Sequence, residues 1–151
     1  MLIGIISDIH GHLSRQAIKA LEGCDIILCA GDVERPDILW ELQAIAPTTA
    51  VLGNCDHRDM GPGVEAVASP LLEGVRFKMV HRPQDIGEVP DDVQVVVHGH
   101  THVPRDEVIA GVRYLNPGSS TRPRGGSSKS LIRMVVRDGK IHSVKFVNLD
   151  W

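Results

Sequence analysis

Short, continuous apolar runs set the pattern of this 151-residue chain. The clearest lie at residues 2–6, 26–30, 50–52 and 93–97, the first rich in isoleucine and the last in valine. Runs of this kind, bounded by polar or turn residues, are typical of strands buried on both faces. The sequence therefore predicts a buried sheet at the centre of the fold.

Two helices are predicted between the first three of these strands. Ser14 is a suitable N-cap for the first helix, and Gly23 is a suitable stop after its apolar stripe. Pro36 fits the first turn of the second helix, which should end before Pro47. The chain therefore begins as a β-α-β-α-β unit.

The later part of the chain reads as strands with little helix between them. Further strands are predicted at residues 75–80, 107–110, 112–115, 131–136 and 140–147. Asp138-Gly139 is a strong hairpin signal between the last two. This change of pattern indicates two sheets packed face to face, with helices over the outer face of at least one. The chain shows no repeat and no long linker, so we expect one domain over residues 1–151.

Composition and charge limit the classes of partner that we expect for this chain. The chain is 42% hydrophobic and 23% charged, with a formal net charge of -3, so it has no overall attraction for nucleic acid or an anionic membrane. A nucleic acid polymer is therefore disfavoured as a partner. The apolar start lacks a basic n-region and no other run is long enough to span a membrane, so we expect neither a signal peptide nor a membrane partner.

The cysteines point to a reducing, cytoplasmic setting. Cys24, Cys29 and Cys55 are odd in number and form no CxxC pair. This argues against a disulfide framework and against a zinc site built from thiolates.

Metal-binding side chains directly follow five of the predicted strands. They are Asp8 and His10, then Asp32, Asn54, His81, and finally His100 and His102. In open α/β sheets, ligands bind at the carboxyl edge of the strands, where the loops converge. We therefore expect these seven residues to meet in one site.

The chemistry of the set is that of a metal centre. Carboxylate, amide and imidazole donors without thiolate suit Mn, Fe, Co, Ni or Zn. Seven donors exceed the four that one tetrahedral zinc needs, which favours two ions about 3.5–4 Å apart that share a carboxylate. Taken singly, Asp8, His10 or Asp32 could instead cap a helix, and Asn54 could be a turn residue. The ordered set favours metal binding.

The order and spacing of these motifs resemble the calcineurin-like metallophosphoesterase superfamily, and in particular its small bacterial phosphodiesterase branch. The resemblance rests on the motifs Asp8-Ile9-His10-Gly11, Gly31-Asp32, Gly53-Asn54-Cys55-Asp56, His81, Gly99-His100-Thr101-His102 and Asn116-Pro117-Gly118-Ser119. It implies an α/β fold, a four-layer α/β/β/α sandwich of two mixed sheets with a di-metal site at one edge. Asp8, His10 and His102 would hold one metal. Asn54, His81 and His100 would hold the other, and Asp32 would bridge the two.

The function that this resemblance implies is di-metal-dependent hydrolysis of a small phosphate ester, most directly a phosphodiester, by a hydroxide that bridges the metals. Asp32, Asn54 and His100 would be the catalytic residues. Manganese is the expected metal, with Ni, Co, Fe or Zn as alternatives. A phosphomonoesterase and a non-catalytic protein-interaction module on the same fold stay open as alternatives. Exposed strands could also pair in a homo-oligomer.

Two positions depart from the family pattern and are candidate substrate contacts. Cys55 stands where many members have a histidine that assists the leaving group, so we expect a preference for good leaving groups. Arg82 stands where glycine is common. Its guanidinium could clamp phosphate or narrow the pocket. Asp56 is expected to accept backbone hydrogen bonds in its turn, and Asn116 to Ser119 could serve only to shape a turn.

Overall fold

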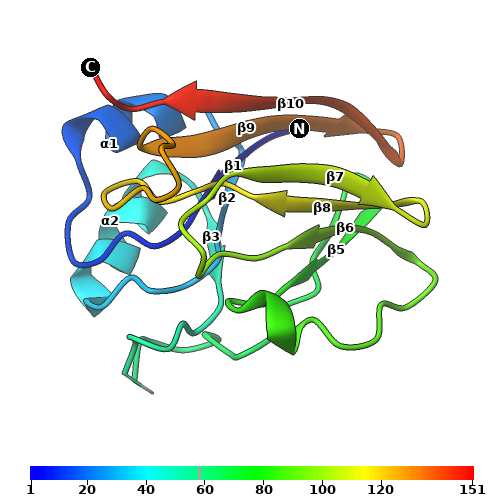
Figure 1. Ribbon diagram of the computed structural model, residues 1–151, viewed down its shortest axis with the longest axis horizontal. Helices are drawn as coiled ribbons and strands as arrows, with labels where there is room; N and C mark the ends of the chain where they lie inside the picture. Colours follow the sequence, from blue (N-terminus) through cyan, green and yellow to red (C-terminus); the bar gives the residue numbers. More distant parts are fainter. Residues whose placement is uncertain (58) are drawn as a thin grey trace.

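Two five-stranded mixed sheets pack face to face in the computed structural model (Figure 1), which describes residues 1–57 and 59–151. The first sheet has the order β10-β9-β1-β2-β3 and the second has the order β4-β5-β6-β8-β7. The strands of the first sheet are β1 (Leu2–Ile6), β2 (Ile26–Cys29), β3 (Thr48–Ala50), β9 (Ser130–Arg137) and β10 (Lys140–Asn148). Those of the second are β4 (Leu71–Leu72), β5 (Val75–Met79), β6 (Val93–Val97), β7 (Arg105–Ile109) and β8 (Val112–Asn116).

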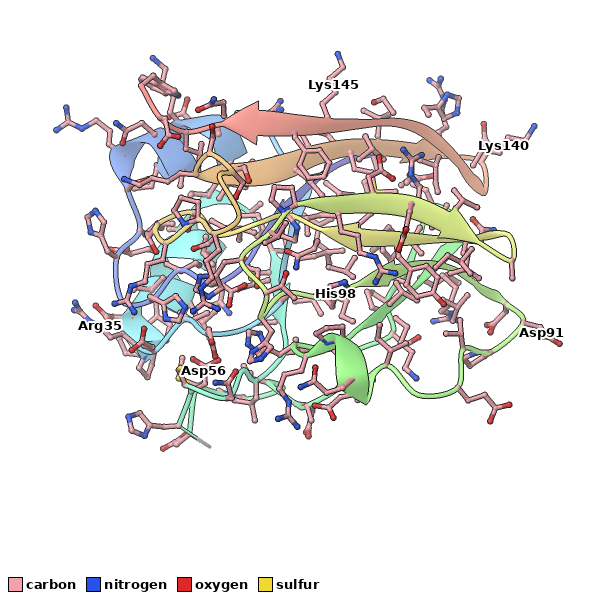
Figure 2. All side chains as sticks on the ribbon, viewed as in Figure 1. Arg35, Asp56, Asp91, His98, Lys140 and Lys145 are labelled. Carbon is pink, nitrogen blue, oxygen red and sulfur yellow. The ribbon has the colours of Figure 1, made fainter. Side chains whose placement is uncertain are left out.

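Each sheet has a parallel centre and antiparallel edges. Strands β1, β2 and β3 run parallel, as do β5, β6 and β8. Parallel strands end at the same edge of a sheet, so the loops that leave them gather there. In Figure 2, Asp56 marks the end of the molecule where these loops lie, and Lys140 in the β9–β10 hairpin marks the opposite end.

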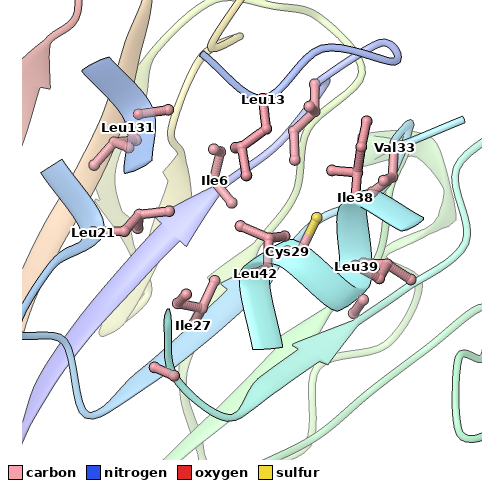
Figure 3. Close-up of a cluster of buried hydrophobic side chains, with 14 of the residues drawn as sticks. Ile6, Leu13, Leu21, Ile27, Cys29, Val33, Ile38, Leu39, Leu42 and Leu131 are labelled. Carbon is pink, nitrogen blue, oxygen red and sulfur yellow. The ribbon is translucent and has the colours of Figure 1, made fainter. Parts of the chain in front are cut away.

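Helices α1 (Arg15–Leu21) and α2 (Pro36–Ile45) cover the outer face of the first sheet. Figure 3 shows Leu21 of α1 and Leu42 of α2 packed with Ile6 of β1 in this apolar layer. Ser14 is the N-cap of α1, because its Oγ accepts a hydrogen bond from the Ala17 N–H at 3.1 Å. The predicted cap is therefore confirmed.

A second apolar layer fills the space between the sheets. Ile3 and Ile5 of β1 face Phe77 of β5 there, whereas Ile6 faces the helices. This division follows from the alternation of side chains along a strand. Because both faces of β1 are buried, its sequence is a continuous apolar run, as the prediction assumed.

The α/β sandwich of two mixed sheets is confirmed, with a lighter outer layer on one side. Both α-helices pack on the first sheet, and the helical element that follows β5 of the second sheet is the short 3-10 helix η1 (Pro83–Asp85). The third strand ends at Ala50 instead of starting there, because Thr48 and Thr49 pair with β2 although they are polar. The two-residue strand β4 was not predicted.

Within the described ranges, no helix combines the length and the apolar character needed to cross a bilayer.

Candidate metal centre

Five of the seven predicted ligands surround one buried point at the carboxyl edge of the parallel strands. Oδ1 of Asp8 lies 3.3 Å from Nε2 of His102 and 3.8 Å from Nε2 of His81. Oδ2 of Asp32 lies 3.2 Å from Nε2 of His81 and 3.8 Å from Nε2 of His10. Two overlapping groups result, Asp8 with His10 and His102, and Asp8 with Asp32 and His81.

Two of the atoms that face this point lack hydrogen-bond partners. Oδ1 of Asp8 and Nε2 of His81 are buried and have no hydrogen bond to any residue within 1–57 and 59–151. The other oxygen of Asp8 is satisfied, since it accepts hydrogen bonds from the Ser7 hydroxyl at 2.8 Å and from the His100 N–H at 3.1 Å. Buried polar atoms without partners are rare and costly. A cation between the two groups would satisfy both atoms.

Three imidazoles are oriented from outside the centre through their Nδ1 atoms. The distances are 2.7 Å from His10 to the Glu34 carboxylate, 2.6 Å from His81 to the Ala30 carbonyl, and 2.6 Å from His102 to the Arg122 carbonyl. An Nδ1–H that donates to an oxygen leaves the Nε2 lone pair free. This is the arrangement that metal-binding histidines adopt in proteins.

Asn54 and His100 lie together at the solvent side of the centre. Oδ1 of Asn54 is 3.1 Å from Nδ1 of His100, and the ring centroid of His100 is 5.3 Å from that of His81. Asn54 is exposed and His100 is half-buried. The structure thus brings all seven predicted residues to one end of the sandwich, with the buried carboxylates at the bottom.

Glycines allow the ligand loops to approach one another closely. A side chain at Gly53 would overlap the carboxylate of Asp32, and a side chain at Gly99 would overlap Ser7 and the carboxylate of Asp8. Glycine is the residue that permits such contact between backbone and functional groups. The Gly-Asp, Gly-Asn and Gly-His pairs of the motifs therefore have a packing reason.

The backbone at the centre is held in an unusual conformation. Asp8, His10, Asp32, His100 and His102 all have positive φ angles, between 49° and 73°. L-residues seldom adopt this region, and such strain persists where the surrounding structure fixes it, often at functional sites. At Asp8, Ser119 provides part of that support, because its hydroxyl donates to the Asp8 carbonyl at 2.7 Å.

The electrostatics of the centre favour an ionised Asp32. Burial alone would raise its pKa, but the adjacent His81 imidazole, the hydrogen bond from the Cys55 N–H and the nearby His10 lower the pKa to about 2. For His81, burial opposes ionisation, yet Asp32, the Ala30 carbonyl and Asp8 raise its pKa. Burial and His81 lower the pKa of His100. The Asp32 carboxylate is therefore charged and able to bind a cation at neutral pH.

Asp56 organises two of the ligand loops, as its predicted structural role implied. Its Oδ2 accepts hydrogen bonds from the N–H groups of Asp32 at 3.0 Å and Gly53 at 2.8 Å. Its Oδ1 accepts one from the Glu34 N–H at 2.7 Å. One carboxylate thus joins the loop after β2 to the loop after β3.

Glu34 was not predicted as a site residue. It lies two residues after Asp32, as His10 does after Asp8, and that shared spacing was the available signal.

The Asn116-Pro117-Gly118-Ser119 motif does more than shape a turn. Asn116 donates to the Gly99 carbonyl at 3.1 Å and Ser119 to the Asp8 carbonyl, so the motif connects two ligand loops.

The two candidate substrate contacts occupy different settings. The Sγ of Cys55 lies within 4.8 Å of ligand atoms of His10 and Asp32. Burial and the Asp32 carboxylate raise the pKa of this thiol, so it is neutral at pH 7. Arg82 follows His81, but its guanidinium already pairs with Asp85, at 2.8 Å from Nε and 3.3 Å from Nη2.

Known proteins are similar to this chain in sequence. Residues 1–139 match the calcineurin-like phosphoesterase superfamily domain. A probable metallophosphoesterase of Methanothermobacter thermautotrophicus is 36% identical over 145 residues, which cover 82% of this chain and 80% of that protein. The chain belongs to the calcineurin-like phosphoesterase superfamily, as the resemblance implied.

Solved structures share the fold of this chain. The phosphoesterase Yfce from E. coli superposes with a TM-score of 0.74 at 26% identity, covering 99% of this chain and 100% of the other. An archaeal phosphodiesterase has a TM-score of 0.79 at 23% identity, covering 98% and 99%. Vps29 of Entamoeba histolytica, solved with Zn²⁺, has a TM-score of 0.78 at 20% identity, covering 99% and 100%. The last two show the same fold.

Proposed function

We propose that this protein hydrolyses phosphodiesters with two divalent cations held by the seven residues. The observation that carries the proposal is that two potential metal-ligand atoms without hydrogen-bond partners, Oδ1 of Asp8 and Nε2 of His81, face one buried point. Membership of a phosphoesterase superfamily supports the reaction class. The donor set fits Mn and equally fits Ni, Co, Fe or Zn, and manganese is the metal that we propose.

The cations would supply an activated water and would neutralise charge on the phosphoryl oxygens. The protein's own residues orient and support that chemistry. Asp8, His10 and His102 form the first ligand group, and Asn54, His81 and His100 form the second. Asp32 would bridge the two groups, a role supported by the approach of its carboxylate to both His10 and His81. Its low pKa keeps it in the charged form that bridging requires.

The leaving group receives little help from the protein in this proposal. Cys55 occupies the place of the family histidine, and a thiol whose pKa is raised is a weak proton donor at neutral pH. Substrates with good leaving groups, such as aryl or otherwise activated phosphodiesters, would therefore react faster than alkyl ones.

A non-catalytic interaction module is the second candidate, because the Vps29 chain shares the fold. The complete donor set argues for the enzyme, since no position of the seven carries an incompetent side chain. The chain keeps buried carboxylates and oriented imidazoles at an energetic cost that a pure docking surface would not require.

The test is hydrolysis of bis-p-nitrophenyl phosphate and p-nitrophenyl phosphate by metal-stripped protein with added Mn, Ni, Co, Zn or Mg. Metal-dependent turnover that falls at least about 100-fold in Asp32→Asn is expected. A higher rate on the diester than on the monoester would support the phosphodiesterase proposal, and the reverse would make the protein a phosphomonoesterase. No turnover with any metal, despite stoichiometric metal binding, would favour the interaction module.

A further inference from the structure

A cleft of about 390 Å³ opens beside the candidate metal centre. Asn54 and His81, two of the predicted ligands, form part of its wall. A phosphate at the centre therefore has this cleft next to it. We call it the ester cleft, and its remaining lining residues are Leu52, Gly53, Ala66, Val67, Val80, Arg82 and Asp85.

The walls of the ester cleft are largely apolar, although the centre beside it is polar. Leu52, Ala66, Val67 and Val80 supply them. Val67 is 49% exposed, which is high for an aliphatic side chain next to a site of buried carboxylates. Small-molecule pockets combine such apolar walls with a few placed polar groups. The ester cleft therefore suits an apolar part of a ligand.

Backbone pairing holds this wall in place. The Leu52 N–H donates to the Glu65 carbonyl at 2.9 Å, which ties the wall to the end of the first sheet. Ala68 and Met79 exchange hydrogen bonds of 3.2 and 2.8 Å, which tie it to β5 of the second sheet. Residues 65–68 thus join the two sheets, and the ester cleft is formed before any ligand arrives.

The rim of the ester cleft carries paired charges. Arg82 and Asp85 neutralise each other through the ion pair described above. A neutralised rim offers hydrogen-bond donors and acceptors but no net charge to attract a second ionic group. The bound group is therefore expected to be uncharged.

We propose that the ester cleft binds the aromatic ring of an uncharged ester group on the substrate, as found in aryl and nucleoside phosphates. This inference rests on the proposed function, because the phosphate must sit at the metal centre. It makes Val67 and its neighbours specificity-determining residues. Metal ligation does not involve them.

The test compares the binding of phenylphosphonate, methylphosphonate and inorganic phosphate to manganese-loaded protein by isothermal titration calorimetry. The carbon–phosphorus bond is not hydrolysed, so binding is measured without turnover. Phenylphosphonate should bind about tenfold more tightly than methylphosphonate, the gain expected from burying part of one ring. Val67→Asn should reduce this ratio to about threefold or less and leave inorganic phosphate unchanged.

Two further variants make the test specific. Ala66→Trp fills the ester cleft and should abolish the preference for the phenyl group. Leu71→Asn is the matched control, because Leu71 is 56% exposed and lies outside the ester cleft, and it should change nothing.

Two results would overturn the inference. One is equal affinity for the two phosphonates in the unaltered protein, and the other is a phenyl preference that survives both Val67→Asn and Ala66→Trp. Failure of the proposed function would give a different result: none of the three anions would bind, and no ester would be hydrolysed.

Discussion

Nδ1 of His10 lies 2.7 Å from Oε2 of Glu34, so a carboxylate outside the metal centre fixes the ring that faces into it. Glu34 itself is fixed, because its N–H donates to Asp56. Partners of this kind orient the ring and raise the basicity of the nitrogen that binds metal.

Glu34→Ala should therefore weaken metal binding at the position of Asp8, His10 and His102 by about tenfold. This is near the lower end of the effect usually seen when the partner of a metal-binding histidine is lost, because the Glu34 side chain is 36% exposed. Titration of metal-stripped protein with Mn²⁺ measures the effect. Glu34→Gln, whose amide oxygen can still accept the hydrogen bond, should restore part of the affinity. Glu41→Ala on the exposed side of α2 is the control. Equal affinities in all four proteins would rule out the orienting role.

Asp56→Asn should destabilise the metal-free protein by about 1–3 kcal/mol, because the amide cannot accept all three backbone hydrogen bonds that the carboxylate accepts. Urea denaturation followed by circular dichroism measures the free energy of unfolding. Asp59→Asn, an exposed acid on the same loop, should lie within about 0.5 kcal/mol of the unaltered protein. A similar loss in both variants would assign the effect to charge alone.

Cys55→His should raise turnover of alkyl phosphodiesters relative to aryl phosphodiesters, because an imidazole can protonate a poor leaving group that the neutral thiol cannot. A change of about 10-fold or more in the ratio is expected. Steady-state kcat/KM for a matched alkyl and aryl diester gives the ratio. If the ratio stays constant, the thiol does not limit the leaving group, and Cys55→Ala should then show the same ratio as well.

Asp106 and Arg113 form a two-pronged ion pair across β7 and β8, with both distances 2.8 Å. The hydrogen bonds from Arg113 lower the pKa of Asp106. A lowered pKa in the folded state means that the pair stabilises the fold above the pKa of the unfolded state and that this contribution is lost as the pH falls.

Asp106→Asn should accordingly lower the free energy of unfolding at pH 7, by less than about 1 kcal/mol, and the difference should disappear in strongly acidic solution. Urea denaturation of both proteins at several pH values measures it. A difference that is constant with pH would assign the effect to packing.

Local sequence patterns were sufficient to predict the elements whose structure is decided by neighbouring residues. The apolar run at residues 2–6 became β1, and Ser14 became the cap of α1. The third strand was displaced because its stability comes from pairing with β2, and the polar Thr48 and Thr49 gave no apolar signal. Strand β4 is too short for any periodicity to appear.

The candidate site could be predicted because strand ends bring their following residues to one edge. Contacts between loops that are distant in sequence were not available to that reasoning. Glu34 reaches His10 across 24 positions, and Asp85 engages the Arg82 guanidinium, for which the sequence left open a phosphate clamp or a narrowing of the pocket. The ester cleft likewise depends on residues 65–68, a segment without a sequence signal.

The most direct measurement is a crystal structure of the manganese-loaded protein, with anomalous scattering recorded to locate the ions. The account predicts two peaks about 3.5–4 Å apart on either side of the Asp32 carboxylate. One peak should lie with Asp8, His10 and His102, and the other with Asn54, His81 and His100. A single peak, or no peak within reach of Asp32, would contradict the two-metal centre.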